Sequence, residues 1–192
     1  EPNVLATAAY AMGEFPPGRR DIRATFNVMV NMVKAHAQAY HAIHEEQPTA
    51  RVGMAINYRG FEPARNWLPL DHWVAGIQSN LFNNFFPEAA SSGVMRFPLW
   101  RRRMPEAKGT QDFLGLNYYT RDYVAFDLRK AGQLFGRRFY LPGADLSDTG
   151  FIANAPQGMF EAIKWGLNYD LPIIITENGV EDADDDLRPR YL

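Results

Sequence analysis

The sequence predicts an α/β protein in which helices cover a parallel sheet. Three observations support this prediction: short apolar runs typical of buried strands, amphipathic helical segments between them, and a polar residue directly after each run. The order along the chain is helix, strand, helix, strand, helix, strand. Open doubly wound sheets and (β/α)8 barrels share this alternation, and the pattern alone leaves both architectures open.

The first helix and the first strand are predicted in the first third of the chain. Apolar residues recur at three- and four-residue steps over residues 26–44, which predicts a helix with Asp21 or Thr25 as its cap. The apolar run at residues 52–56 then predicts a buried strand that ends at Asn57.

The second helix and the second strand follow with the same kind of pattern. Asp71 is a plausible N-cap for a helix that ends near Pro87. A short apolar run at residues 113–116 predicts the next buried strand, which ends at Asn117.

The third helix and the third strand are predicted in the last part of the chain. Pro156 is placed at the first position of a helix, and apolar residues at helical spacing continue to Leu167. The β-branched run at 173–176 predicts a strand that ends at Glu177. The segments between the pairs are predicted to be long loops, which are uncommon unless functional; they cover residues 58–70, 86–111 and 120–155.

Composition excludes several functional classes. A count of 20 Lys and Arg against 22 Asp and Glu gives a net charge of −2, so nucleic-acid binding is not expected. Since the chain has no Cys, disulfides, thiolate nucleophiles and Cys-ligated metals are excluded. No apolar run approaches the roughly 20 residues that span a bilayer, so no membrane partner is expected. Without glycosylation acceptors or Cys, we expect a cytoplasmic location.

No metal or other cofactor is predicted. His41 and His44 stand three residues apart on a helix, but no matching carboxylate motif accompanies them. The alternating acids Asp182, Asp184 and Asp186 resemble the start of a calcium loop without its glycine, so a solvated loop is the expectation. No G-x-G-x-x-G follows a strand, which is unfavourable for a dinucleotide cofactor.

Glu1 and Glu177 are the sharpest candidates for chemistry. If both terminate neighbouring strands, two carboxylates face one cleft, as glycoside hydrolysis requires: one attacks the anomeric carbon and the other protonates the departing oxygen. A plainer reading is that Glu1 is merely terminal and that Glu177 occupies an Asn-Gly turn. A third reading is a different (β/α) enzyme whose strand-end carboxylates transfer protons.

Three strings of residues stand at strand ends in a fixed order. Glu1-Pro2-Asn3 opens the chain, Gly115-Leu116-Asn117-Tyr118-Tyr119 ends the second strand, and Ile174-Ile175-Thr176-Glu177-Asn178-Gly179 ends the third. They resemble the tail of the N-E-P motif, the G-[LI]-N-Y-Y strand end and the I-T-E-N-G signature of glycoside hydrolase family 1, the β-glucosidase and β-galactosidase family. Ala35-His36-Ala37 and the run over residues 13–18 also fit that family.

The resemblance implies a (β/α)8 TIM barrel and a retaining β-glycosidase that works by double displacement on terminal β-linked sugars. By this resemblance Glu177 is the nucleophile, Glu1 is the general acid/base, and Tyr119 donates a hydrogen bond to the nucleophile. Asn117 lies near both carboxylates and is expected to bind substrate. The partners implied are a small glycoside or oligosaccharide and the remaining part of the barrel.

Other candidate binding residues come from position alone. Asn57 ends a strand and either lines the cleft or caps a turn. Trp100 and Trp67 lie in predicted loops, where an aromatic face suits the apolar face of a sugar. Trp73 and Trp165 fall in predicted helices and are expected in the core.

The chain is expected to be a piece of a longer protein, and residues 1–192 are predicted to form one incomplete barrel domain. It opens at Glu1 without an initiator Met and would cover roughly the end of barrel strand 4 through strand 7. The alternative to an enzyme is therefore a catalytically inactive barrel fragment that only binds or assembles with its missing half.

Overall fold

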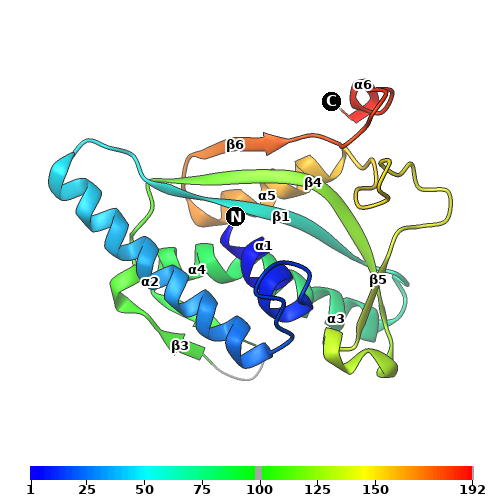
Figure 1. Cartoon of the computed structure of the whole chain (residues 1–192), viewed down its shortest axis with the longest axis horizontal. Helices are drawn as coiled ribbons and strands as arrows, with labels where there is room; N and C mark the ends of the chain where they lie inside the picture. Colours follow the sequence, from blue (N-terminus) through cyan, green and yellow to red (C-terminus); the bar gives the residue numbers. More distant parts are fainter. Residues whose placement is uncertain (98–100, 192) are drawn as a thin grey trace.

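Three parallel strands of a four-stranded sheet organise the computed structural model, which describes residues 1–97 and 101–191. The strands are β1 (Gly53–Pro63), β4 (Phe113–Phe126) and β6 (Ile173–Asn178). Figure 1 shows β4 between the other two strands, and both pair with it in parallel. The three predicted strands and their order in the chain are thus confirmed.

Two strands are longer than the sequence pattern predicts. β1 and β4 continue past their polar residues and stay paired as far as Pro63 and Val124. The extension of β4 also pairs antiparallel with β5 (Gly136–Phe139). The prediction of loops at 58–63 and 120–126 was wrong, because charged and aromatic side chains interrupt the apolar runs while the backbone pairing continues.

The long helix α2 (Ile22–Glu46) confirms the first predicted helix and begins four residues earlier. Asp21 is its cap, since this carboxylate accepts the backbone N–H groups of Arg23 and Ala24 at 2.8 and 3.2 Å. Thr25 does not cap the helix; its hydroxyl donates to the Asp21 carbonyl instead.

The second predicted helix does not stop at Pro87. α3 (Pro69–Ser79) runs into a π-helical turn, η2 (Asn80–Asn84), and then into α4 (Phe85–Ser92). Pro87 is the third residue of α4, so the chain stays helical through this proline. Gly93 ends α4 in the left-handed region with φ 70°, so part of the predicted loop at 86–111 is helical.

The third predicted helix begins two residues later than expected. α5 (Gly158–Gly166) starts after Pro156 and packs on β4 around Leu116 and Tyr118. The remaining elements are short and were not predicted: α1 (Pro2–Ala6), η1 (Thr7–Met12), β2 (Val94–Arg96), β3 (Arg101–Arg103), η3 (Pro105–Ala107), η4 (Leu128–Gln133), η5 (Leu167–Tyr169) and α6 (Arg188–Tyr191).

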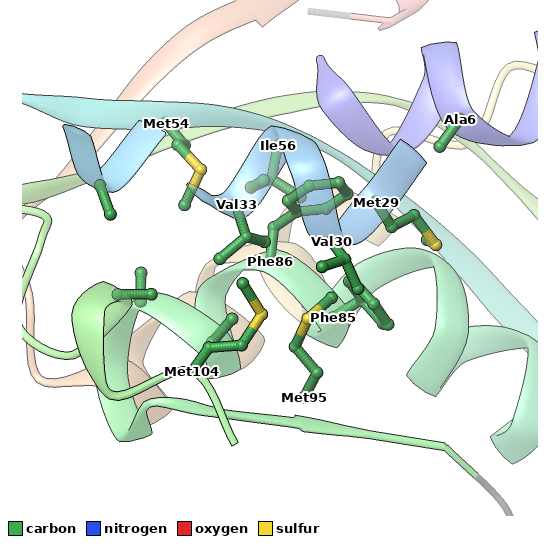
Figure 2. Packing of buried hydrophobic residues seen from close by; sticks show 14 of the residues in the cluster. Ala6, Met29, Val30, Val33, Met54, Ile56, Phe85, Phe86, Met95 and Met104 are labelled. Atoms are coloured by element: carbon green, nitrogen blue, oxygen red, sulfur yellow. The ribbon is translucent and has the colours of Figure 1, made fainter. Parts of the chain in front are cut away.

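The main core lies between one face of the sheet and the helices α2 and α4. Figure 2 shows Val33 of α2, Ile56 of β1 and Phe86 of α4 pointing toward one another. Each of these three side chains is almost fully buried. This packing holds the sheet against its helical layer. Burial of each large apolar side chain contributes about 1.5–3 kcal/mol to stability.

The other side of the molecule is less covered. β6 pairs only with β4 within the described residues, and Ile174 and Ile175 are 43% and 49% exposed. None of the described helices combines the length and apolarity needed to cross a membrane.

Candidate functional site

Three polar residues form one row across the sheet. In the strand register Asn57 of β1 faces Asn117 of β4, and Asn117 faces Glu177 of β6. Parallel pairing places these residues at the same level, beyond the buried apolar part of each strand. The polar residues that follow the three apolar runs in the sequence therefore lie side by side in this row.

Glu1 is attached to the same row from the start of α1. Its Oε1 atom accepts one hydrogen bond from Asn57 Nδ2 at 3.0 Å and another from Asn117 Nδ2 at 2.7 Å. The first and the last third of the chain thus meet at one group of side chains. The plainer reading of Glu1 as an uninvolved terminal residue does not match this geometry.

Asn3 fixes the helix that carries Glu1, and sequence reasoning missed this role. Its fully buried side-chain amide donates to the carbonyls of Asn57 and Phe82 at 2.7 and 3.2 Å. Its Oδ1 also accepts the backbone N–H of Asn57 at 3.4 Å. The available signal was its place in the Glu1-Pro2-Asn3 string, two residues after a candidate catalytic carboxylate.

Tyr119 binds Glu177 and lies close enough to Glu1 to be influenced by its charge. Its hydroxyl donates a hydrogen bond to Glu177 Oε2. Burial raises the pKa of this phenol, and so do the hydrogen bond to Glu177 and the negative charges of Glu177 and Glu1. The phenol therefore stays protonated at neutral pH and acts as a donor.

Thr176 completes the row from the residue before Glu177. Its hydroxyl donates to Asn117 Oδ1, while Asn117 Nδ2 points to Glu1. Asn117 is fully buried, so both ends of its amide are satisfied by side chains.

A cleft of about 560 Å³ opens beside Glu1, Asn57 and Tyr119. Its far wall includes Tyr140 and Phe151, from the segment that follows β5. Glu177 does not line this cleft and is exposed on the edge strand. Tyr119 lines the cleft and binds Glu177, so the cleft and Glu177 meet at this residue.

A charged cluster in this cleft was not predicted. Arg59 of β1 donates two hydrogen bonds to Asp122 of β4, both at 2.8 Å, and one to Tyr140 at 2.8 Å. Burial opposes the charge on Arg59, but the hydrogen bonds to Asp122 still hold the pKa of Arg59 above its usual value. Burial lowers the pKa of the neighbouring Arg138. The cluster was missed because both partners lie in strand extensions that the pattern predicts as loops.

The tryptophans are distributed differently from the prediction. Trp73 is 53% exposed on α3, so its expected core position was wrong. Trp165 is partly buried in the core and donates to Asn84 Oδ1 at 2.6 Å. Trp67 is 77% exposed outside the cleft, and Trp100 lies outside the described residues.

Metal ligation has no support in the described part of the chain. Nowhere among those residues do three or more His, Asp or Glu side chains form a group that could hold a metal ion. His44 instead lies 3.3 Å from Asp112, which also accepts from Tyr40.

Comparisons with known proteins agree with the geometry. The family model described as "Glycosyl hydrolase family 1" matches residues 1–190. The β-galactosidases of Sulfolobus acidocaldarius and Pyrococcus woesei are 30% and 29% identical over all of this chain, which covers 40% and 43% of their lengths. The chain therefore spans less than half the length of these curated relatives.

Solved structures give the same result for the fold. The β-glycosidase from Pyrococcus horikoshii superposes with a TM-score of 0.87 at 30% identity, and this chain covers 44% of it. The family 1 β-glucosidase from Thermotoga maritima superposes with a TM-score of 0.87 at 25% identity, with 47% of that chain covered. Both comparisons cover all of this chain, whose fold is thus part of a TIM barrel. With a family match along nearly its whole length, the chain belongs to glycosyl hydrolase family 1.

Proposed function

We propose that the longer protein containing this chain is a retaining β-glycosidase, with Glu177 as its nucleophile and Glu1 as its general acid/base. The observation that carries the proposal is the row of Asn57, Asn117 and Glu177 in strand register, with Glu1 bound to both amides. The carboxylate of Glu1 is thereby held at β4, the strand next to the one that carries Glu177. This placement suits a reaction that uses both carboxylates on one sugar ring.

In the first half of the reaction, Glu177 attacks the anomeric carbon of the bound sugar. The bond from that carbon to the leaving oxygen breaks as Glu1 gives its proton to this oxygen, and a glycosyl ester of Glu177 forms. The Tyr119 hydroxyl donates to Glu177 and so favours the ionised carboxylate that the attack requires.

In the second half, Glu1 removes a proton from a water molecule that attacks the same carbon. The ester bond to Glu177 breaks, and the sugar leaves with the configuration it had in the substrate. This double displacement requires carboxyl groups about 5–5.5 Å apart, which distinguishes it from the wider pair of an inverting enzyme and from simple proton transfer.

The proposed substrate is a small β-linked glycoside or oligosaccharide. Relatives at about 30% identity are named β-galactosidase, and others are named β-glucosidase, which supports this class. The cleft beside Glu1 offers aromatic faces and polar side chains to the part of the substrate that departs. Because the amides of Asn57 and Asn117 are engaged with Glu1, their direct contact with sugar stays a prediction.

The test is replacement of Glu177 in the full-length protein. Glu177→Ala should lower kcat by at least about 10⁴-fold, because no other group forms the ester. A 2-fluoro-glycoside should label Glu177 covalently in the unchanged enzyme, as seen by peptide mass spectrometry. Near-normal turnover by Glu177→Ala, or a label on another residue, would remove the assignment.

A further inference from the structure

We propose that Arg138 is a specificity-determining residue: its guanidinium donates to a hydroxyl oxygen of a second sugar ring, so the preferred leaving group is a neutral sugar rather than an apolar alcohol. The inference rests on the proposed function and narrows its substrate class. It follows from the position of the cleft, from the donors that Arg138 leaves without an oxygen partner, and from the charges on the cleft walls.

The cleft lies on the side of the proposed acid/base. Glu1 lines it, whereas Glu177 does not. Since Glu1 is proposed to protonate the leaving oxygen, the cleft on its side receives the leaving group. Its volume of about 560 Å³ is within the range of sites that bind small molecules.

Arg138 lines this cleft with guanidinium N–H groups that no oxygen atom of the described residues accepts. The carboxylate oxygen Oδ2 of Asp122 lies 3.8 Å away, too far for a hydrogen bond. Both oxygens of Asp122 already accept from Arg59 at 2.8 Å. The hydrogen bond that Arg138 does donate, at 3.9 Å, ends on the sulfur of Met12, which is a weak acceptor.

The strand β5 holds Arg138 in this position. Its backbone pairs with Val124 of β4, and its side chain is 28% exposed. Burial disfavours the charge and lowers the pKa of Arg138. A partly buried cation without an oxygen acceptor is costly, so an oxygen atom of a bound molecule stabilises it. The adjacent Arg137 does not line the cleft, because successive side chains of a strand point to opposite faces.

The charges on the cleft walls favour a neutral partner for Arg138. Two guanidinium groups and four carboxylates line the cleft: Arg59, Arg138, Glu1, Glu14, Asp122 and Glu181. Because the carboxylates are in excess, the cleft disfavours an anionic leaving group. A hydroxyl group both accepts and donates, so a sugar ring can accept from Arg138 and donate to Glu14, whose charge already acts on Arg138.

Two substrates that differ in their hydroxyl groups test the role in the full-length enzyme. One is a β-linked disaccharide, and the other is the cyclohexyl β-glycoside of the same terminal sugar, whose leaving group is a ring of similar size without further hydroxyls. Arg138→Met keeps the length of the side chain and removes its donors. It should lower kcat/KM for the disaccharide about 10–100-fold more than for the cyclohexyl glycoside, because a hydrogen bond to a charged group is lost. Arg138→Lys keeps a charged donor and should show a smaller difference.

Arg137→Met is the matched control on the same strand. It removes an arginine that is 48% exposed and should leave the ratio of the two kcat/KM values unchanged. Equal losses on both substrates in Arg138→Met, or the same change of ratio in Arg137→Met, would overturn the inference. A disaccharide whose second ring carries a carboxylate should be a poorer substrate than the neutral one, and a preference for it would also contradict the proposal.

Covalent labelling separates this inference from the proposed function. If the 2-fluoro-glycoside labels Glu177 in Arg138→Met while the ratio of the two kcat/KM values stays unchanged, the retaining mechanism stands and the role of Arg138 fails. If no label forms on Glu177 in the unchanged enzyme, the proposed function and the inference fail together.

Discussion

Both carboxylates of the site, Glu1 and Glu177, influence the Tyr119 phenol. Its phenol donates to Glu177, and the negative charges of Glu177 and Glu1 both help to raise its pKa. A donor that stays protonated at neutral pH stabilises the ionised form of Glu177, the proposed nucleophile, without adding a negative charge of its own.

Tyr119→Phe in the full-length enzyme should lower kcat roughly 10–100-fold, since a hydrogen bond to a charged group contributes about 1.5–3 kcal/mol. Steady-state kinetics on an aryl glycoside measure this effect. Tyr123→Phe is the matched control, because Tyr123 lies on the same strand but does not line the cleft. A loss of similar size in both variants would contradict a specific role for Tyr119.

Asp71 is a second residue with a larger role than its predicted one. It is fully buried and accepts two hydrogen bonds from the Arg65 side chain, at 2.7 and 2.8 Å, and one from the backbone N–H of Phe126 at 2.8 Å. It therefore ties α3 to the far ends of both β1 and β4. The prediction of Asp71 as the N-cap was wrong, since α3 begins at Pro69 with Leu68 as its cap and Asp71 lies in the first turn. A cap and a buried anchor favour the same residue type, so the sequence did not separate the two roles.

Asp71→Ala should lower the free energy of unfolding by about 2–4 kcal/mol, because it leaves the Phe126 N–H and the Arg65 guanidinium without their acceptor. Urea titration at pH 7 measures the loss. The control is Asp185→Ala, which removes an exposed ion pair with Arg188 and should change stability far less.

The same carboxylate gives a pH dependence. The hydrogen bond from Arg65 holds the pKa of Asp71 below its usual value. A group with a lowered folded-state pKa stabilises the fold above its unfolded pKa near 4, and this contribution is lost as the pH falls through the folded value. The stability difference between the original protein and Asp71→Ala should therefore shrink below about pH 4; a constant difference would refute the linkage.

At the scale of elements, the strands and the three main helices were predictable because each has its own apolar period. The strand extensions and β5 were not predictable, because charged and aromatic residues interrupt their apolar pattern and their pairing comes from neighbouring strands. The π-helical turn η2, with three asparagines among its five residues, has no apolar period of its own. The row of Asn57, Asn117 and Glu177 was predictable as a set of strand ends. The contacts of the two amides with Glu1 required the register of β1 and β4, which no local pattern specifies.

The start of α5 shows how one glycine determines the distance between two elements. A Cβ atom at Gly158 would lie 1.9 Å from the Tyr118 hydroxyl, which is buried and donates to the Ala155 carbonyl at 2.6 Å. Only glycine lets the start of α5 approach β4 this closely.

Gly158→Ala should destabilise the protein by about 1–3 kcal/mol through overpacking. Gly76→Ala is the matched helical control: nothing lies within 4 Å of its added Cβ, so it should stabilise α3 by about 0.5–1 kcal/mol. Thermal melting of both variants measures the two opposite shifts. A stabilising effect at Gly158 would contradict the close approach to Tyr118.

At the scale of the whole molecule, the edge strand β6 and the helical segment α5–η5 expose large apolar side chains. Besides Ile174 and Ile175, the apolar side chains of Phe160 and Leu167 are 64% and 59% exposed. An edge strand with exposed apolar neighbours associates readily with other chains.

The 192-residue chain produced alone should therefore form oligomers and show no turnover, whereas the full-length protein should stay monodisperse under the same conditions. Light scattering and an aryl-glycoside assay measure the two properties. Turnover by the isolated chain would show that the described residues suffice for catalysis, and a monodisperse isolated chain would show that the β6 edge is harmless.

Asn3 has one more consequence, for engineering. Because it ties α1 to Asn57 and Phe82, the placement of Glu1 depends on segments that follow it in the chain. A cut in the polypeptide just ahead of Glu1 should then leave the proposed acid/base in place. Under the proposed function, two separately expressed pieces divided at this point should regain glycosidase signal only when brought together, as in a split reporter.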